Sequence, residues 1–147
     1  MREVKRSALV SQPPPVVFAL INDIESYPQF LPWCTHARVQ SRTAQEIVAT
    51  LGVRQSGFSG EFTTRNTLTP ERCVLMHLLN GPFRSLEGQW LLEPIGADGC
   101  RVDFSVRFEF KSRLSAVLFE PLFAHTIGSL MEAFAQRARQ HPKAAPP

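Results

Sequence analysis

Hydrophobic residues recur at every second position over most of the middle of the chain. In the clearest run, residues 101–110, valine and phenylalanine alternate with polar or charged residues. This alternation is typical of a β-strand with one buried face and one wet face. Residues 47–53, 58–62 and 86–92 share the pattern, and residues 3–11 form a further predicted strand. The pattern therefore predicts a first strand followed by six more, seven in all.

Turn signals separate these strands. Gly52 and Gly57 stand at the two ends of residues 52–57, an Asn-Gly-Pro sequence occupies residues 80–82, and Gly-Ala-Asp-Gly occupies residues 96–99. Such segments between alternating runs are typical of hairpins, so the strands are expected to form one antiparallel, meander-like sheet.

Two segments have helical spacing instead. Residues 13–15 are prolines, which end the first strand because proline has no N–H for a ladder, and a short helix is expected over about residues 14–22. Between Phe123 and Ala138 apolar residues recur at intervals of three and four, which predicts a long amphipathic helix. Pro121 is expected in its first turn, with residues 114–119 forming a separate short turn.

This order of elements predicts an α+β fold with an internal space. A helix is only about 10–12 Å across, so it cannot cover one face of a seven-stranded sheet. A sheet curved around the C-terminal helix would enclose a space lined by aromatic and aliphatic side chains, and glycines such as Gly60 and Gly88 permit the bending. The pattern therefore predicts a container for a hydrophobic ligand.

The length and the cysteines limit the class of protein. The chain of 147 residues is expected to form one domain over residues 1–141, followed by a disordered tail at 142–147. Three widely spaced cysteines exclude a disulfide scaffold and a zinc finger and indicate a reducing compartment. The basic start lacks the apolar segment of a signal peptide, and charged or proline residues interrupt residues 114–131. We therefore expect a cytoplasmic protein without a membrane span, with transient membrane contact as a further expectation.

The basic residues leave two interpretations open. The net charge is +3, and arginines are scattered from Arg2 to Arg139 without a dense run. They form either an ordinary solvated surface or an RNA-facing patch, and no DNA partner is expected.

Motifs for catalysis are missing from the sequence. It contains no phosphate-binding glycine loop and no metal-ligand spacing among its histidines, so no metal or catalytic residue is predicted. Cys34 and His36 place a thiol near an imidazole, but a nucleophilic pair needs hydrogen-bond geometry that neighbouring residues rarely supply. A surface or structural role is expected for both.

Several motifs together resemble one family. They are YPQFLPWC at residues 27–34, FTTRN at 62–66, GPF at 81–83, LEGQW at 86–90 and FEF at 108–110. The sequence resembles the START-like polyketide cyclase/dehydrase group, in the branch that contains coenzyme Q-binding proteins and the bacterial ribosome-association toxin. The resemblance covers about residues 2–140.

This resemblance implies a helix-grip fold, with a tunnel between the sheet and the C-terminal helix. It implies ubiquinone as the ligand of eukaryotic relatives, which serve respiration, and the large ribosomal subunit as the partner of the toxin branch, which blocks subunit joining. The cyclase activity belongs to more distant relatives.

The candidate ligand-binding residues come from the tunnel-facing strands, the helix and the aromatic string. They are Tyr27, Phe30, Leu31, Trp33, Phe62, Thr64, Asn66, Phe83, Trp90, Phe104, Phe108, Phe110, Phe123, Leu130, Phe134 and Arg137. For each apolar residue the alternative is an ordinary core position, or, for the string at residues 27–33, a cluster that closes one end of the sheet.

The polar candidates are argued from their positions. Thr64 and Asn66 continue the parity of Phe58 and Phe62, so they are expected to point inward as a polar anchor. Arg137 lies near the edge of the helical stripe. It is expected either to reach a ligand oxygen or, as we prefer, to pair with a strand glutamate such as Glu109 or to cover apolar surface.

The leading hypothesis is a non-enzymatic carrier for a hydrophobic ligand, ubiquinone or a related isoprenoid lipid, with no required cofactor. The second is a ribosome-binding inhibitor of translation whose arginines contact RNA phosphates. The third, a polyketide cyclase or dehydratase, requires an acid/base pair inside the tunnel.

Overall fold

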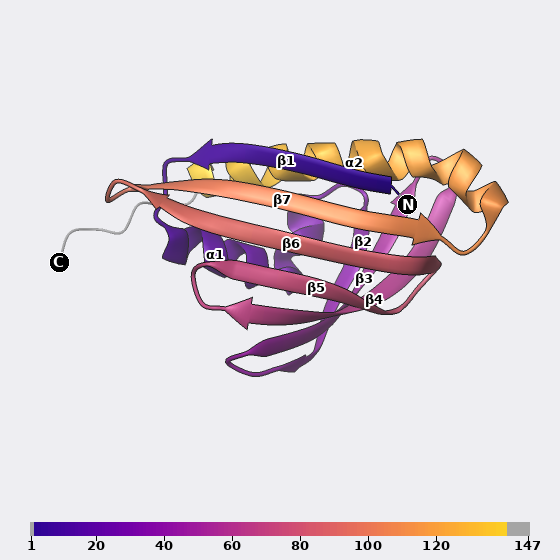
Figure 1. The fold of residues 1–147 in the computed structure, drawn as a ribbon, viewed down its shortest axis with the longest axis horizontal. Coiled ribbons are helices and arrows are strands. Elements are labelled where there is room, and N and C mark those ends of the chain that lie inside the picture. Colours follow the sequence, from indigo (N-terminus) through magenta and orange to yellow (C-terminus); the bar gives the residue numbers. More distant parts are fainter. Residues whose placement is uncertain (1, 141–147) are drawn as a thin grey trace.

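The chain folds into one antiparallel sheet around a long helix, and a computed structural model describes residues 2–140 (Figure 1). The elements in order are β1 (Arg2–Val10), α1 (Pro14–Asn22), the 3₁₀ helix η1 (Ile24–Gln29), β2 (Cys34–Arg42), β3 (Glu46–Gln55), β4 (Phe58–Thr69), β5 (Cys73–Asn80), β6 (Phe83–Ile95), β7 (Gly99–Phe110) and α2 (Arg113–Gln140). The tail predicted at residues 142–147 lies outside the described residues.

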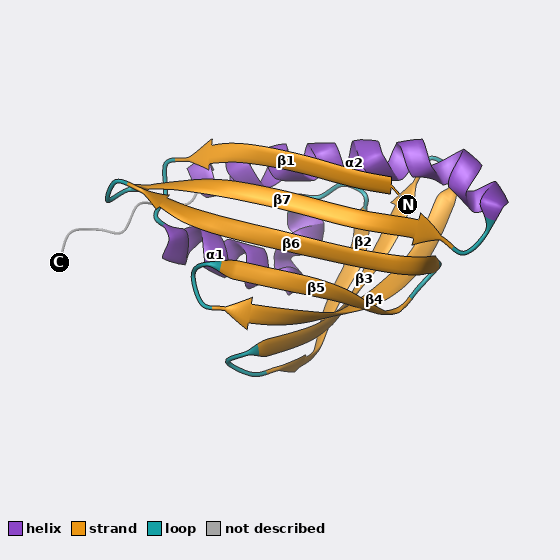
Figure 2. Cartoon of the chain, viewed as in Figure 1, coloured by secondary structure: helices purple, strands orange, loops and turns teal. Residues whose placement is uncertain are grey.

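The seven strands form a single sheet in the order β1-β7-β6-β5-β4-β3-β2, with every neighbouring pair antiparallel (Figure 2). Strands β2 to β7 are a meander, and β1 adds to its last strand. The predicted α+β helix-grip fold, with seven antiparallel strands and a long C-terminal helix, is therefore confirmed.

The sheet is strongly curved, and α2 lies on its concave side. Figure 1 shows β1, β7 and β6 crossing the front of the molecule while β2, β3 and β4 run steeply behind them. The register shifts at four places, in β2, between β4 and β5, and at the start of β6. Such bulges bend a strand and increase its twist, which lets the sheet close around the helix.

Three tight turns fall inside the segments that the sequence predicted. They occupy residues 56–57, 81–82 and 96–98. Gly52, which we placed at the border of the first turn, lies inside β3 instead. There the His36 imidazole packs against its backbone, since an added Cβ would lie 2.2 Å from His36 Cε1.

The start of α2 differs from the prediction. Pro121 lies inside this helix rather than in its first turn, and residues 114–119 are part of the same helix. Ser112 explains the earlier start, because its hydroxyl accepts a hydrogen bond from the Ser115 N–H at 3.3 Å and its carbonyl accepts one from Ala116. Proline removes the hydrogen bond to the Val117 carbonyl, and Val117 is 75% exposed, where water can replace the lost donor.

Within residues 2–140, α2 is the helix whose length and apolar composition would suffice to cross a membrane. In this fold its apolar stripe instead packs into the concave side of the sheet. Ile127, Met131, Phe134 and Ala138 are all buried there.

Replacement of Phe108 by alanine is expected to lower the free energy of unfolding by about 3–5 kcal/mol. The ring is fully buried and lies 4.7 Å from the Phe123 ring, centroid to centroid, so its removal leaves a cavity. Urea denaturation measures the effect. Leu91→Ala, on the outer face of the sheet at 44% exposure, is the matched control. A loss no larger than that of the control would contradict the proposed core.

Candidate ligand cavity between the sheet and α2

An apolar cavity of about 80 Å³ lies between α2 and the inner face of the sheet. Because side chains alternate between the two faces of a strand, β3 to β7 each send every second side chain toward this space. One water needs about 10–15 Å³ on the same measure, so the cavity has room for a small ring but not for a whole lipid. Its walls are Ile21, Ile24, Tyr27, Trp33, Ala49, Leu51, Val53, Phe62, Thr64, Asn66, Val74, Met76, Leu86, Trp90, Phe104, Val106, Phe123, Thr126, Ile127, Leu130 and Phe134.

A side-chain amide in the wall is available as a hydrogen-bond donor. Thr64 and Asn66 are buried neighbours on the inner face of β4, as their parity predicted. The Thr64 hydroxyl donates to Asn66 Oδ1 at 2.8 Å. This bond leaves Asn66 Nδ2 without a protein acceptor among residues 2–140, so the amide is a donor for a ligand oxygen.

The other short polar side chains of the wall are engaged in bonds within the protein. The Tyr27 hydroxyl donates to the Ile21 carbonyl, which ties η1 to α1. Burial raises the pKa of this hydroxyl far above its usual value, so it stays protonated. Thr126 donates to the Leu122 carbonyl, one turn earlier in α2, at 3.0 Å. Tyr27 therefore contributes its ring to the cavity rather than a free hydroxyl.

The cavity wall carries no acid/base pair. Among its residues, all within the described part of the chain, there is no carboxylate, imidazole, amine or guanidinium. General acid–base catalysis uses such a group, or a tyrosine or cysteine, within reach of the substrate and with a suitable pKa. The Tyr27 hydroxyl of this wall is hydrogen-bonded within the protein, and its pKa is raised by burial.

The thiol of Cys34 and the imidazole of His36 do not form a nucleophilic pair. Cys34 Sγ lies 3.5 Å from the His36 carbonyl oxygen, and burial raises the pKa of the thiol to about 11. The imidazole instead bonds Glu61 at 2.7 Å on the outer face of the sheet. At neutral pH the Cys34 sulfur remains a thiol and is a poor nucleophile.

The structure brings ten of the candidate residues together around the cavity and places six outside it. The ten are Tyr27, Trp33, Phe62, Thr64, Asn66, Trp90, Phe104, Phe123, Leu130 and Phe134. The six are Phe30, Leu31, Phe83, Phe108, Phe110 and Arg137.

Three of those six close one end of the cavity. Phe83, Phe108 and Phe110 pack on Phe123 at the N-terminal half of α2, with ring centroids 4.7 to 6.1 Å away. They share the inner face of β6 and β7, as predicted, but stack beyond the open space. Their role in this structure is an aromatic plug.

Arg137 lies outside the cavity and contacts η1. Its Nη2 donates to Gln29 Oε1 at 3.2 Å, and its guanidinium carbon lies 5.0 Å from the centroid of the Phe30 ring. It does not pair with Glu109. We preferred a pairing with a strand glutamate, or a stem over apolar surface with the charged head in water. The structure instead places the guanidinium itself against Gln29 and the Phe30 ring.

Trp33 separates the cavity from the outside. It borders both the cavity and an external groove of about 470 Å³, which Leu31 also lines, together with Arg54 from β3 and Glu132 from α2. Of the residues that line the groove, Trp33 is the one that also lines the cavity.

Sequence reasoning missed the aliphatic part of the wall. Ala49, Leu51 and Val53 share one face of β3, and their alternation was a signal that could have identified them. Ile21 and Ile24 come from α1 and η1, and the sequence pattern does not show that these short helices border the cavity.

Comparison with known proteins places the chain in a family. The family model for polyketide cyclase / dehydrase and lipid transport matches residues 10–135. The ribosome association toxin RatA of Escherichia coli K12 is 38% identical over 95% of this chain and 89% of its own length. The mitochondrial coenzyme Q-binding protein coq10 of Schizosaccharomyces pombe is 26% identical over 92% and 85%.

A solved structure supports the fold. The aromatase/cyclase Zhui of Streptomyces sp. R1128 superposes with a TM-score of 0.85 over 95% of this chain and 94% of its own, at 17% identity. At that identity the likeness concerns the fold alone. The family match over most of the chain and the similarity to RatA show that the chain belongs to the START-like polyketide cyclase, dehydrase and lipid transport family.

Proposed function

We propose that this protein is a non-enzymatic binding protein for a hydrophobic molecule whose ring carries carbonyl oxygens, ubiquinone or a related isoprenoid. The observation that carries the proposal is an apolar cavity with an available amide donor, Asn66 Nδ2, and no carboxylate, imidazole, amine or guanidinium in its wall. The name of the relative coq10, a coenzyme Q-binding protein, supports the same ligand class. The protein would act in the cytoplasm beside the inner membrane and support respiration.

Two different interactions would hold such a ligand. Burial of the ring among Phe62, Trp90 and Phe104 would supply affinity at about 25 cal/mol per Å² of apolar surface. The Asn66 amide would donate to a ring carbonyl and fix its orientation. The cavity has room for the ring only, so the isoprenoid tail would leave past Trp33 into the external groove.

A second function, binding of the large ribosomal subunit, is favoured by the similarity to RatA. Arg38 and Arg54 are exposed and have no ion-pair partner within residues 2–140, so they are suited to RNA phosphates. Elsewhere on the outer face charges are interspersed. Arg65 and Arg107 lie 3.4 and 3.9 Å from Glu46 and Glu3. This mixing weakens the attraction of that face for RNA and makes the ribosome the second proposal.

Native mass spectrometry of protein purified gently from its host, followed by solvent extraction, is the first test. We expect the protein to carry a bound molecule that extraction releases as a quinone or isoprenoid. An apolar ligand would shield the apolar wall of the cavity from water. An empty protein that sediments with large ribosomal subunits at low salt would overturn the carrier proposal and favour the second function.

Asn66→Leu is expected to weaken binding of a short-chain ubiquinone about tenfold, because it removes a buried donor while keeping the side-chain size. Quenching of intrinsic fluorescence measures binding directly, since Trp33 and Trp90 both line the cavity. Thr67→Val, an exposed position on the outer face of the same strand, is the control. Equal affinities for the two variants would show that Asn66 does not anchor the ligand.

Ala49→Met is expected to abolish quinone binding, because the longer side chain fills space that the ring would take. Thermal melting of the empty protein checks that the variant folds.

Sucrose-gradient sedimentation with ribosomes then separates the two functions. Subunit binding that survives Ala49→Met but decreases in Arg38→Ala/Arg54→Ala, with a shallower salt dependence, would assign the ribosomal role to these two arginines. Full quinone binding by Ala49→Met would contradict the proposed site.

A further inference from the structure

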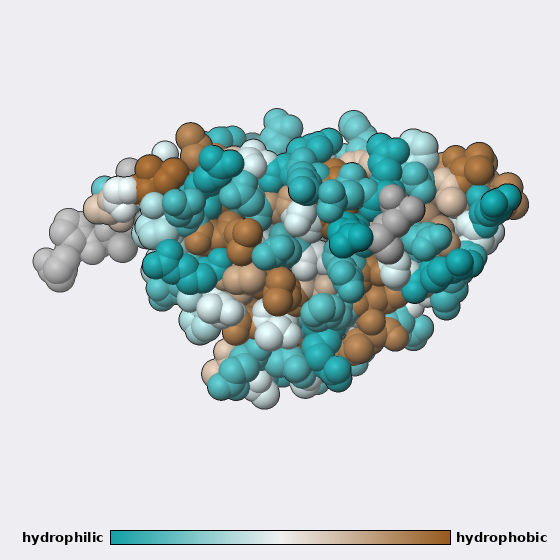
Figure 3. Space-filling model, in the orientation of Figure 1, coloured by the Kyte–Doolittle hydropathy of each residue, from teal (hydrophilic) through white to brown (hydrophobic). Residues whose placement is uncertain are grey.

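The first turns of α2 expose a row of large aliphatic side chains. Leu114, Val117 and Leu118 are 69%, 75% and 57% exposed. Their spacing of three and four residues places them on one side of the helix. Figure 3 shows a hydrophobic cluster at the end of the molecule where α2 begins. We call residues 111–119 the helix tip.

Basic side chains surround this row. Lys111 and Arg113 precede it in the chain, and Arg84 is the third basic residue of the area. All three side chains are exposed and have no ion-pair partner in the described part of the chain. Arg84 is close because the Lys111 N–H donates to the Pro82 carbonyl at 3.1 Å, which joins the β5–β6 turn to the tip.

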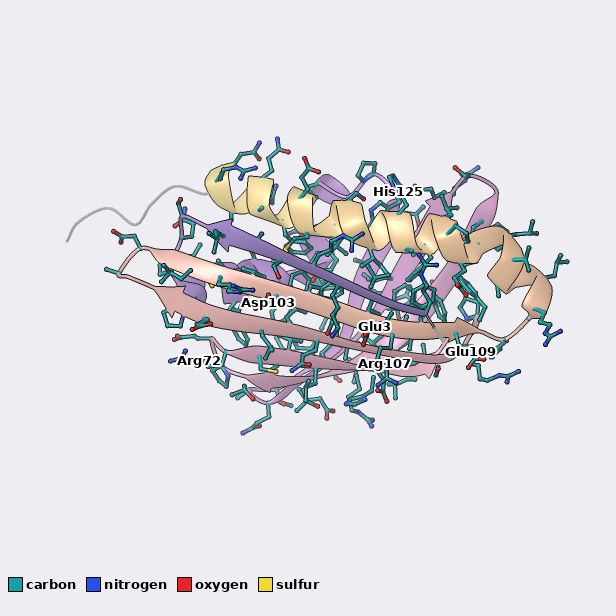
Figure 4. The ribbon with its side chains drawn as sticks, turned by 45° about the horizontal axis from the view of Figure 1, so that its top comes forward. Glu3, Arg72, Asp103, Arg107, Glu109 and His125 are labelled. Atoms are coloured by element: carbon teal, nitrogen blue, oxygen red, sulfur yellow. The ribbon has the colours of Figure 1, made fainter. Side chains whose placement is uncertain are left out.

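The nearby carboxylates leave this basic excess in place. Glu120 pairs with Arg2 at 3.7 Å, and Glu109 lies at the end of β7 (Figure 4). The area therefore combines protruding apolar side chains with a net positive charge.

The opposite side of the tip packs on the sheet next to the ligand cavity. Phe119 packs on Phe58 with ring centroids 5.0 Å apart. Behind these rings is a void of about 10 Å³, and Val53, Phe123 and Thr126 line both this void and the cavity. The exposed row and the cavity wall are thus two faces of the same helix.

We propose that the helix tip docks on an anionic phospholipid bilayer. Leu114, Val117 and Leu118 would enter the interface, and the three cations would contact the headgroups. The charge favours this partner over a second copy of the chain. In a two-fold contact the same cations would face each other and repel, whereas anionic headgroups attract them. The proposal goes beyond the proposed function, since it requires no ligand in the cavity.

Co-sedimentation with sucrose-loaded vesicles tests the proposal. We expect binding to phosphatidylcholine vesicles that contain about 30% phosphatidylglycerol, and much weaker binding to phosphatidylcholine alone. The variant Leu114→Gln/Val117→Gln/Leu118→Gln is expected to bind at least about tenfold more weakly, and glutamine keeps the helix propensity. Leu9→Gln is the matched control, because Leu9 is equally exposed, at 71%, and lies at the end of β1 away from the tip.

A second variant separates charge from apolar contact. Lys111→Gln/Arg113→Gln is expected to lose the preference for anionic vesicles while its aliphatic row remains intact, and circular dichroism melting checks that both variants fold. Equal vesicle binding by the wild type and the triple variant would overturn the proposal. So would a wild-type dimer that the triple variant converts to monomer, since the row would then be an interface between copies. Ribosome binding that depends on Lys111 and Arg113 without any vesicle binding would also overturn it.

Discussion

The rest of this structure depends on the mismatch between one helix and a seven-stranded sheet. Helix α2 contacts the sheet mainly at β1 and β7, which are neighbours at one edge. The inner faces of β3 to β5 lie farther along the sheet, and they avoid water only because the sheet curves back over the helix. The bulges in β2, β5 and β6 contribute to that curvature, and the space that no element fills is the cavity.

Aromatic rings then determine where the space begins and ends. At the N-terminal half of α2, Phe83 and Phe108 pack edge-on against their neighbours, and at the other end Tyr27 and Phe30 pack on Phe134 at 5.3 and 5.1 Å. Edge-to-face packing fixes ring orientation better than aliphatic contact does. The cavity is therefore an open space between two aromatic clusters, and its adjacent pair of short polar side chains, Thr64 and Asn66, lies on β4.

Periodicity predicted well which face of an element each side chain occupies, and poorly where along the axis of α2 that side chain lies. Thr64 and Asn66 point inward because strand parity requires it, and parity is visible in the sequence. The same parity placed Phe108 and Phe110 on the correct face, but it carries no information on position along the helix axis, so they appeared as candidate lining residues. Arg137 bonds Gln29 because η1 lies beside the end of α2, a tertiary contact that helical spacing does not encode.

The start of α2 was predicted wrongly for a related reason, and that error concerns function. Proline was given more weight than the Ser112 cap, which separated residues 114–119 from the helix. Joined to α2, these residues become a rigid extension that carries aliphatic and basic side chains beyond the sheet. A lipid ligand is sparingly soluble in water, so a carrier benefits when its bilayer contact and its cavity belong to one helix. Phe119 and Phe123 are one turn apart in α2, and Phe123 packs on Phe83 of the plug, so the exposed tip and the closed end of the cavity are built on one continuous helix.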